Sequence, residues 1–322
     1  MKKLEERRKS HLEDLFIRYG FIMHRRFHVR EKTRFLVALS KEFEALGYAT
    51  VVKTVKARQF KVRNLYVGNV KEADTIVTTY YDTPTIGKST YKVLEKAPKK
   101  VFALIFDALP LAITMILGVY FILYVGLPSW NQGLGSMASI LSLLFSLFLF
   151  GLLINFRHGI GRRRNTIQNT SSVLAIIDAA TQLDENLKDK VAFVLTDSGC
   201  INHFGAKLIP AQINDKNQSK TYVMLDGVGG PGEPQIATCS DLMTRTRKAS
   251  RDVYETVGPI LSLEDPQAKQ RKLFKKTILL SRGMRQSDNE IVVSRNLDKG
   301  GADQMMTNIR LASEFIRSFV KQ

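Results

Sequence analysis

The sequence predicts an α/β fold, a mixed sheet flanked by helices, with a long apolar α-helical hairpin inserted into it. Strand patterns and helix patterns alternate along most of the chain, which is typical of a sheet covered by helices. Between residues 101 and 156, by contrast, two long apolar runs follow each other almost without a charge. With 322 residues, 44% of them hydrophobic, the chain is long enough to bury one sizeable core beside this insertion.

Residues 1–48 are expected to form one or two basic amphipathic helices. Apolar residues recur there at helical spacing, which is the pattern of a helix with one buried face. They are Leu12, Leu15, Phe16, Tyr19, Ile22 and Met23, and then Phe35, Leu36, Leu39, Phe43 and Leu46. This amino end is charged and has no apolar h-region, so no cleavable signal peptide is expected.

The α/β domain is expected to consist of residues 49–100 and 157–322, the two pieces that remain when the apolar insertion is removed. Strand patterns occupy 49–56, 60–69, 74–81, 190–197, 221–229 and 276–282. Helical patterns occupy 171–183 and, at the end of the chain, about 304–320. This alternation predicts that helices cover both faces of the sheet.

The insertion, residues 101–156, is predicted to be a transmembrane hairpin. Its apolar runs, 101–126 and 136–156, each have the length that a spanning helix needs, about 20 residues. No Lys or Arg lies between Lys100 and Arg157, and Asp107 is the single acidic residue there. We expect Asp107 to pair with a Lys at the membrane surface or to contact another membrane protein. The alternative for the region is two buried helices of a soluble core.

Positive charge gathers beside the hairpin and in the N-terminal helices, and the chain has a formal net charge of +18 and a pI near 9.9. The basic residues beside the hairpin are Lys99, Lys100, Arg157, Arg162, Arg163 and Arg164. Because basic flanks stay in the cytoplasm, the pattern predicts a two-span protein of the cell membrane with both termini cytoplasmic. The expected partners are membrane lipid and a protein in the membrane or cytosol. No zinc-finger or helix-turn-helix spacing favours nucleic acid.

Polar residues stand at the ends of several predicted strands and at the head of the helix near residue 171. The stretches are TTYYDT (78–83), IQNTSSVLAIIDAA (167–180), the turn at 198–200, YVMLDGVGG (222–230) and QSDNE (286–290). In this order they resemble the metal-site motifs of the M28 zinc aminopeptidases, over nearly all of the chain outside the hairpin. The resemblance implies a zinc-exopeptidase-like fold.

The same resemblance implies that the family's two-zinc site is dismantled in this chain. The positions that match the family's metal ligands are Tyr80, Gln168, Cys200, Asp226 and Asn289. Of these, Asp226 alone is a carboxylate, with Asp82 as a supporting one, and Gly199 stands where the family has its general base. One carboxylate does not hold zinc tightly, and no base is left to activate water. We therefore expect neither a catalytic residue nor a cofactor.

Other chemistries are weaker alternatives. Cys200 and His203 could form a nucleophilic pair, and four carboxylates could bind magnesium or calcium. Those carboxylates are Asp82, Asp197, Asp226 and Asp288. The glycine-rich stretch 227–234 lacks the Lys of a phosphate loop and is interpreted as a flexible loop. The basic stretch 243–251 is interpreted as a solvated helix face. Two cysteines are too few for a disulfide framework, and they indicate a reducing compartment.

The function that best fits these observations is that of a membrane-anchored, cytosol-facing, peptidase-like pseudoenzyme. It would act as a binding, scaffold or regulatory subunit of a membrane complex. The first alternative is a divergent metal-dependent aminopeptidase, which would use zinc. The second is a structural membrane organiser that uses only the hairpin and the basic helices.

Overall fold

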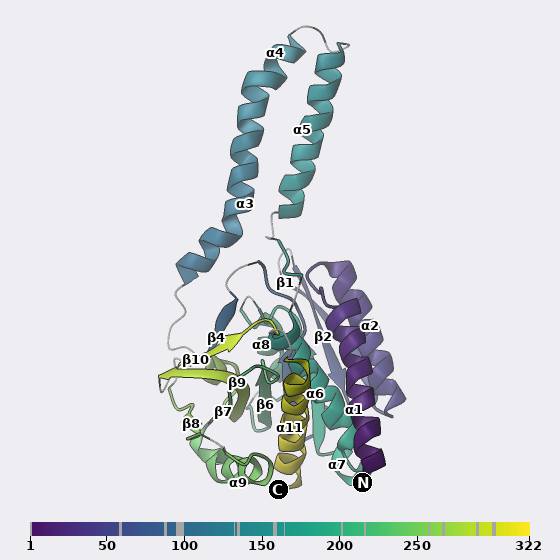
Figure 1. The fold of residues 1–322 in the computed structure, drawn as a ribbon, viewed down its shortest axis with the longest axis vertical. Coiled ribbons are helices and arrows are strands. Elements are labelled where there is room, and N and C mark those ends of the chain that lie inside the picture. The colour runs from purple at the N-terminus through teal and green to yellow at the C-terminus, as the bar shows by residue number, and fades with distance from the viewer. Residues whose placement is uncertain are drawn as a thin grey trace. The chain divides into compact units, whose positions relative to one another are not determined.

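The structure is a computed structural model, which describes residues 2–57, 60–86, 89–94, 100–131, 133, 136–156, 160–163, 165–200, 202–215, 217–256, 258–265, 268–287, 290–297 and 301–322. The chain divides into two compact units (Figure 1). The α/β unit comprises Met1–Pro84, Lys88–Ala97 and Arg163–Gln322. The hairpin unit comprises Thr85–Gly87 and Pro98–Arg162, and it is thus inserted in the sequence of the α/β unit.

A ten-stranded mixed sheet forms the centre of the α/β unit. Its strands are β1 (Thr50–Ala57), β2 (Phe60–Val67), β3 (Thr75–Tyr80), β4 (Thr90–Leu94), β5 (Val191–Thr196), β6 (Thr221–Asp226), β7 (Glu233–Thr238), β8 (Leu261–Ser262), β9 (Thr277–Ser287) and β10 (Glu290–Ser294). The main path runs β1-β2-β5-β3-β6-β9-β10-β4, and β7 joins it at β9 and carries β8. The neighbours β5, β3, β6 and β9 are parallel, and antiparallel strands complete both sides.

The central strands β3, β5 and β6 are buried at every position. Their runs of Val, Ile, Leu and Thr suit strands whose two faces are both covered. The register places Tyr80 of β3 opposite Thr196 of β5, at the carboxyl ends of both strands. Residues that follow β3, β5 and β6 therefore meet at one edge of the sheet, which is where ligand sites of parallel sheets lie.

Helices pack against this sheet as the alternating pattern predicts. They are α1 (Lys2–Phe16), α2 (Val29–Ala45), α6 (Ser171–Gln182), α7 (Glu185–Lys188), α8 (Phe204–Gln212), α9 (Met243–Val253), α10 (Lys269–Leu273) and α11 (Ala302–Lys321), with the π-helices η1 (Ile17–Ile22) and η3 (Thr166–Thr170) and the 3₁₀ turn η4 (Ser240–Leu242). The central helix α6 is buried along ten consecutive residues and packs against α11 and β3. Together with the mixed sheet, these helices confirm the predicted fold class.

The N-terminal helices are part of the α/β unit and contribute to its core. Phe43 of α2 stacks on Phe193 of β5 with ring centroids 6.1 Å apart, and Tyr19 of η1 meets Phe35 of α2 edge-on at 5.5 Å. A buried ion pair connects α1 to α6. Arg8 Nη2 lies 2.5 Å from Oδ2 of Asp178, a residue of α6 whose side chain is fully buried. Arg8, one of the basic residues of the N-terminal helices, thus stabilises the fold of the α/β unit.

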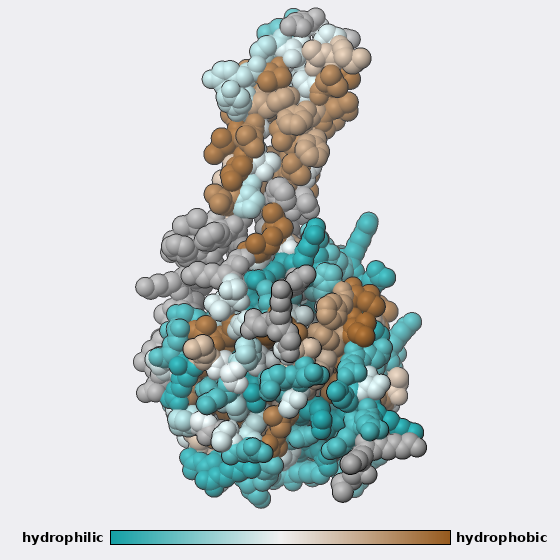
Figure 2. All heavy atoms as spheres, in the orientation of Figure 1, coloured by the Kyte–Doolittle hydropathy of each residue, from teal (hydrophilic) through white to brown (hydrophobic). Residues whose placement is uncertain are grey.

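The hairpin unit consists of two long helical segments. They are α3 (Lys100–Phe121) with η2 (Ile122–Gly126) and α4 (Leu127–Trp130), and then α5 (Met137–Phe156). Within them, Ala108–Trp130 and Met137–Ile154 are long and apolar enough to cross a membrane, with mean hydropathy 2.2 and 2.5. Only 6% and 17% of these stretches are buried, whereas helices of a soluble core are mostly covered. Figure 2 shows the resulting apolar surface along both helices.

Several charged residues that the sequence analysis named beside and within the hairpin are not described by the structure. The side chains of Lys100 and Asp107 are not among those described, and Lys99, Arg157 and Arg164 are outside the described residues. Within the hairpin unit, the Ile86 amide donates to the Ile160 carbonyl at 2.8 Å and draws together the two chain segments that flank the helices.

We predict that Arg8→Ala destabilises the protein by about 3 kcal/mol, because it leaves the buried Asp178 carboxylate without its cation. Lys9→Ala is the matched control. The Lys9 side chain is 59% exposed and its ion pairs are 3.9 and 4.0 Å long, so its loss should change stability by less than about 0.5 kcal/mol. Thermal and urea unfolding of the full chain measure both effects, and equal losses would contradict the structural role of Arg8.

Candidate functional site

The candidate site lies at the carboxyl ends of β3 and β6, where Tyr80 and Asp226 close their strands. The Tyr80 hydroxyl donates a hydrogen bond to Oδ1 of Asp226 at 2.8 Å. The Tyr91 hydroxyl, from β4, donates to the same oxygen at 2.6 Å. Two phenols therefore hold the one carboxylate that the sequence retains from the resembled metal site.

Gln168 joins this pair from η3, directly before α6. Its Nε2 donates to the Tyr80 hydroxyl at 3.1 Å, and its Oε1 accepts a hydrogen bond from Arg295. The Arg295 guanidinium also lies over the Tyr91 ring, 4.9 Å from its centroid. We call Tyr80, Tyr91, Gln168, Asp226 and Arg295 the tyrosine–aspartate cluster. Tyr91 and Arg295 were not predicted, since they lie in or directly after strands that the sequence did not reveal.

Asp82 has a different task from the one that the metal-site motif implies. Its two carboxylate oxygens accept the Gly199 amide at 2.7 Å and the Cys200 amide at 3.2 Å. The Cys200 thiol donates to the Asp82 carbonyl at 3.0 Å, and the Asn169 amide donates to the same carbonyl. Asp82 therefore fixes the turn that follows β5. This turn lies close to the tyrosine–aspartate cluster, because Gln168 Nε2 is 3.8 Å from Cys200 Sγ.

Little free volume is left at this site. A Cβ added to Gly199 would lie 2.1 Å from Cβ of Tyr80, so no larger residue fits at the position matching the general base. The cavity that remains between Tyr80, His203 and Asp226 measures about 10 Å³, room for one water molecule at most. In the described part of the chain, the side chains therefore fill most of the space at the carboxyl ends of β3 and β6.

The described residues at this site do not fit zinc. In the described part of the chain, no three His, Cys, Asp or Glu side chains come together in a way that could hold a metal ion. Burial raises the pKa of Tyr80 and of the Cys200 thiol well above their usual values, and both groups are engaged in hydrogen bonds, Tyr80 to Asp226 and Cys200 to the Asp82 carbonyl. Asp226 already accepts two hydrogen bonds through one oxygen. Asn289 lies outside the described residues.

Among the described residues, the alternative chemistries do not assemble either. Asp82 accepts hydrogen bonds from the turn after β5, Asp197 forms an ion pair with Lys32 at 2.5 Å, and Asp288 is outside the described residues. In place of contacting Cys200, the His203 ring packs edge-on against Tyr80, with centroids 5.5 Å apart. Burial lowers the pKa of His203 well below its usual value. In the described residues the Cys200 thiol donates to the Asp82 carbonyl and not to the His203 ring, so the two do not form a nucleophile–base pair.

The flexible-loop interpretation was wrong for the first half of the glycine-rich stretch, residues 227–230, which are buried, whereas residues 231–233 are exposed. Two amides of the buried half bind the head of α6. The Gly227 amide donates to Ser172 Oγ, and the Gly229 amide donates to Ser171 Oγ at 3.0 Å. Gly227 has a φ of 67°, and a Cβ there would lie 2.6 Å from the Tyr91 hydroxyl. Glycine is therefore required where this turn passes the tyrosine–aspartate cluster.

Two basic residues of the N-terminal helices reach the same region. Arg26 is fully buried and donates to Asn169 Oδ1 at 2.7 Å and Thr170 Oγ1 at 2.8 Å, and burial lowers its pKa to about 10. Lys32 binds Asp197, as described above. In the sequence, Arg26 and Lys32 belong to a cluster of charges that was interpreted as binding an anionic partner. No local pattern predicted that their side chains would bind groups inside the protein.

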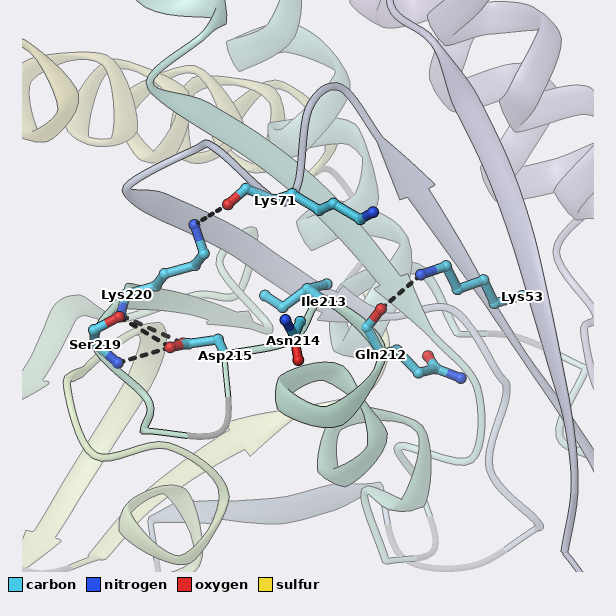
Figure 3. Close-up of a pocket in the computed structure, with 8 residues that line it drawn as sticks. All are labelled: Lys53, Lys71, Gln212, Ile213, Asn214, Asp215, Ser219 and Lys220. Atoms are coloured by element: carbon cyan, nitrogen blue, oxygen red, sulfur yellow. Dashed lines mark hydrogen bonds between the residues drawn. The ribbon is translucent and has the colours of Figure 1, made fainter.

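A second, larger hollow lies at the opposite edge of the sheet, at the amino ends of β3 and β6 (Figure 3). It measures about 640 Å³ and is open and polar. Lys53 and Lys220 border it, but their ammonium groups donate to the main-chain carbonyls of Gln212, at 2.7 Å, and Lys71, at 2.8 Å. The Asp215 carboxylate there accepts hydrogen bonds from Ser219. This hollow shares no residue with the tyrosine–aspartate cluster.

The fold class that these features define is the zinc-exopeptidase-like fold. No family model and no curated protein sequence matches the chain. Among solved structures, the chain resembles a glutaminyl cyclase of Porphyromonas gingivalis, with a TM-score of 0.52, 12% identity, and 95% of each chain covered. A Zn-dependent exopeptidase of Parabacteroides distasonis has a TM-score of 0.52 and 10% identity, with 97% of this chain and 96% of that chain covered.

A glutaminyl cyclase of Bacteroides thetaiotaomicron, bound to N-acetylhistamine, gives a TM-score of 0.51 at 10% identity, with 97% of this chain and 96% of that chain covered. At such identities the comparison establishes the fold and not the activity. The zinc-exopeptidase-like fold implied by the sequence motifs is confirmed, and the likeness to glutaminyl cyclases was not foreseen.

We predict that the stability conferred by Asp226 decreases as pH rises. Burial raises its pKa from 3.8 to about 6, although the Tyr91 and Tyr80 hydrogen bonds oppose this shift. The folded state therefore holds a proton that the unfolded state releases between pH 4 and 6. This contribution is complete below about pH 4 and is lost as pH rises through about 6.

Melting temperatures of wild type and Asp226→Asn at pH 5, 6 and 7.5 test this prediction. Wild type should lose about 1.4 kcal/mol more stability between pH 5 and 7.5 than the variant, because only the part of the pKa shift that lies above pH 5 acts in this range. Asp82, whose pKa burial also raises to about 6, contributes equally to both proteins. Asp241→Asn, at an exposed carboxylate, is the control and should follow wild type. Parallel pH profiles for wild type and Asp226→Asn would contradict the assignment.

We also predict that Gly199→Ala destabilises the protein by about 1–3 kcal/mol, because the added methyl group meets Cβ of Tyr80. Gly258→Ala is the control, since a Cβ there has no atom within 4 Å. Combining Gly199→Ala with Tyr80→Gly removes the contact at its source. The two losses should then be markedly non-additive in a double-mutant cycle. Additive losses would show that Tyr80 does not fill the position of the missing base.

Proposed function

We propose that the protein is a membrane-anchored, cytosol-facing, M28 peptidase-like pseudoenzyme. In this role it acts as a binding, scaffold or regulatory subunit of a membrane complex. The observation that carries the proposal is the tyrosine–aspartate cluster, in which the hydroxyls of Tyr80 and Tyr91 donate to the carboxylate that a metal would need, and the Gln168 amide donates to the Tyr80 hydroxyl. A cleft of about 10 Å³ admits no peptide, so partners would bind elsewhere on the surface.

Anchoring in a membrane is supported by the hairpin unit. Its two apolar stretches are mostly exposed, and exposing this much apolar surface to water is unfavourable without a bilayer or a partner to cover it. The sequence places basic residues on both flanks and none in the connection between the helices. The positive-inside rule then favours a cytoplasmic α/β unit and both termini in the cytoplasm.

The metal-free character can be tested on the purified full chain. We predict far less than one zinc per chain by elemental analysis, and neither hydrolysis of aminoacyl substrates nor cyclisation of N-terminal glutaminyl peptides. Asp226→Asn should change stability and abolish no activity. An active zinc aminopeptidase serves as the positive control. Stoichiometric zinc, or a chelator-sensitive activity lost in Asp226→Asn, would instead favour a divergent metal-dependent aminopeptidase.

The membrane topology can be tested in intact cells. A tag at either terminus should be protected from an external protease, whereas a tag inserted at Asn131, between the helices, should be accessible. Neutralising Arg162, Arg163 and Arg164 together should invert the hairpin in part of the population or weaken its anchoring, since the positive charge sets the orientation. An externally accessible N-terminus would refute the proposed orientation.

A further inference from the structure

The turn between η1 and α2 carries an unusual set of exposed apolar side chains. We call residues 21–30 the tip. Phe21 is 59% exposed, Ile22 66% and Val29 58%, although they lie close together along the chain. Figure 2 shows apolar side chains gathered on the α/β unit in the region where Figure 1 draws α1 and α2. A contiguous apolar patch on a charged protein indicates an interaction surface.

Uncompensated positive charge accompanies the tip. Arg30 and Arg34 are exposed on consecutive turns of α2, and the described part of the chain provides neither of them with an acidic partner. Neighbouring arginines are engaged: Arg25 pairs with Glu31 at 3.4 Å, and Arg26 is buried. Two free cations beside Phe21, Ile22 and Val29 make a surface that is apolar and basic at once.

The tip is a built structure and not a frayed end. The Glu31 carboxylate caps α2 by accepting the Phe27 and His28 amides, both at 2.9 Å. The Arg26 amide donates to Thr83 Oγ1, and the Thr83 amide donates to the Arg26 carbonyl, both at 3.1 Å. The exposed apolar side chains are therefore presented by a backbone that is held at several points.

The same contacts join the tip to the segment by which the chain returns from the hairpin unit. Thr83 stands directly before Pro84, after which Thr85–Gly87 belong to the hairpin unit, and the chain returns at Lys88 and leaves again after Ala97. The buried Arg26 side chain also binds Asn169 and Thr170, shortly after the chain re-enters the α/β unit at Arg163. If the hairpin spans a membrane, the short chain between Arg162 and Asn169 limits how far the tip can lie from the bilayer.

We infer that the tip docks onto an anionic membrane surface. Phe21, Ile22 and Val29 enter the interfacial region, and the guanidinium groups of Arg30 and Arg34 bind lipid phosphate or carboxylate groups. Amphipathic surfaces bind bilayers through this combination of apolar burial and attraction to anionic lipid. The inference rests on the proposed membrane anchoring and adds a second, peripheral contact that would fix the orientation of the α/β unit on the bilayer.

An environment-sensitive fluorophore on Ile22→Cys tests the contact in the full chain. Val51→Cys is the matched control, because Val51 is 55% exposed on β1, away from the tip. The unsubstituted chain measures background labelling of Cys200 and Cys239. Each protein is reconstituted in phosphatidylcholine vesicles with and without phosphatidylserine. We expect a blue shift and quenching by brominated lipid at position 22, at least about twofold stronger than at position 51.

Phosphatidylserine should strengthen the signal at position 22, and combining Ile22→Cys with Arg30→Gln and Arg34→Gln should remove that dependence. Equal signals at positions 22 and 51 in pure lipid vesicles would overturn the inference, as would a shift at position 22 that appears only when membrane proteins are added. The latter outcome would assign the tip to a protein partner.

Hairpin insertion is measured on the same samples with the tag at Asn131, so that the two proposals can fail separately. An inserted hairpin with an unchanged signal at position 22 overturns the docking of the tip and leaves the anchoring intact. A signal at position 22 that depends on phosphatidylserine, without insertion, supports the docking and refutes the anchoring.

Discussion

The buried guanidinium of Arg26 is the interaction on which the arrangement of the α/β unit depends. It lies 4.5 Å from the centroid of the Phe35 ring and donates to Asn169, Thr170 and the Tyr19 carbonyl. It thereby joins the N-terminal helix pair to the head of α6. These hydrogen bonds offset part of the cost of burying the cation, whose Nε has no partner among the described residues, and they hold the segments in a single arrangement. The candidate site and the tip are built on the two sides of this residue.

In the tyrosine–aspartate cluster, a hydrogen bond from Tyr80 to Asp226 joins the carboxyl ends of β3 and β6. The Tyr91 hydroxyl donates to the same carboxylate, and the Gln168 amide donates to the Tyr80 hydroxyl. Neutral donors compensate a buried carboxylate less fully than a cation does, which agrees with its raised pKa. The glycines at 199 and 227 make room for the two aromatic rings.

The large positive charge of the chain is divided between structure and surface. Arg8, Arg26 and Lys32 stabilise the core by binding Asp178, Asn169 and Asp197. Arg30 and Arg34, which are close neighbours of these residues in the sequence, remain exposed. A net charge therefore overstates the charge available to an anionic partner, and the position of each cation decides its role. Arg30 and Arg34 adjoin the apolar side chains of the tip in the sequence, where both kinds of residue favour a membrane surface.

The sequence by itself determined the features that depend on local patterns. Buried parallel strands read as continuous apolar runs, the apolar hairpin stands out by its hydropathy, and Tyr80, Gln168 and Asp226 follow recognisable strand and helix boundaries. Only the tertiary structure decided that Tyr91 and Arg295 complete the cluster, because β4 and β10 are short and pair with each other across nearly 200 residues of chain. It also decided that Arg26 is internal. Burial of a cation depends on helices packing from distant parts of the chain, and periodicity carries no information about such contacts.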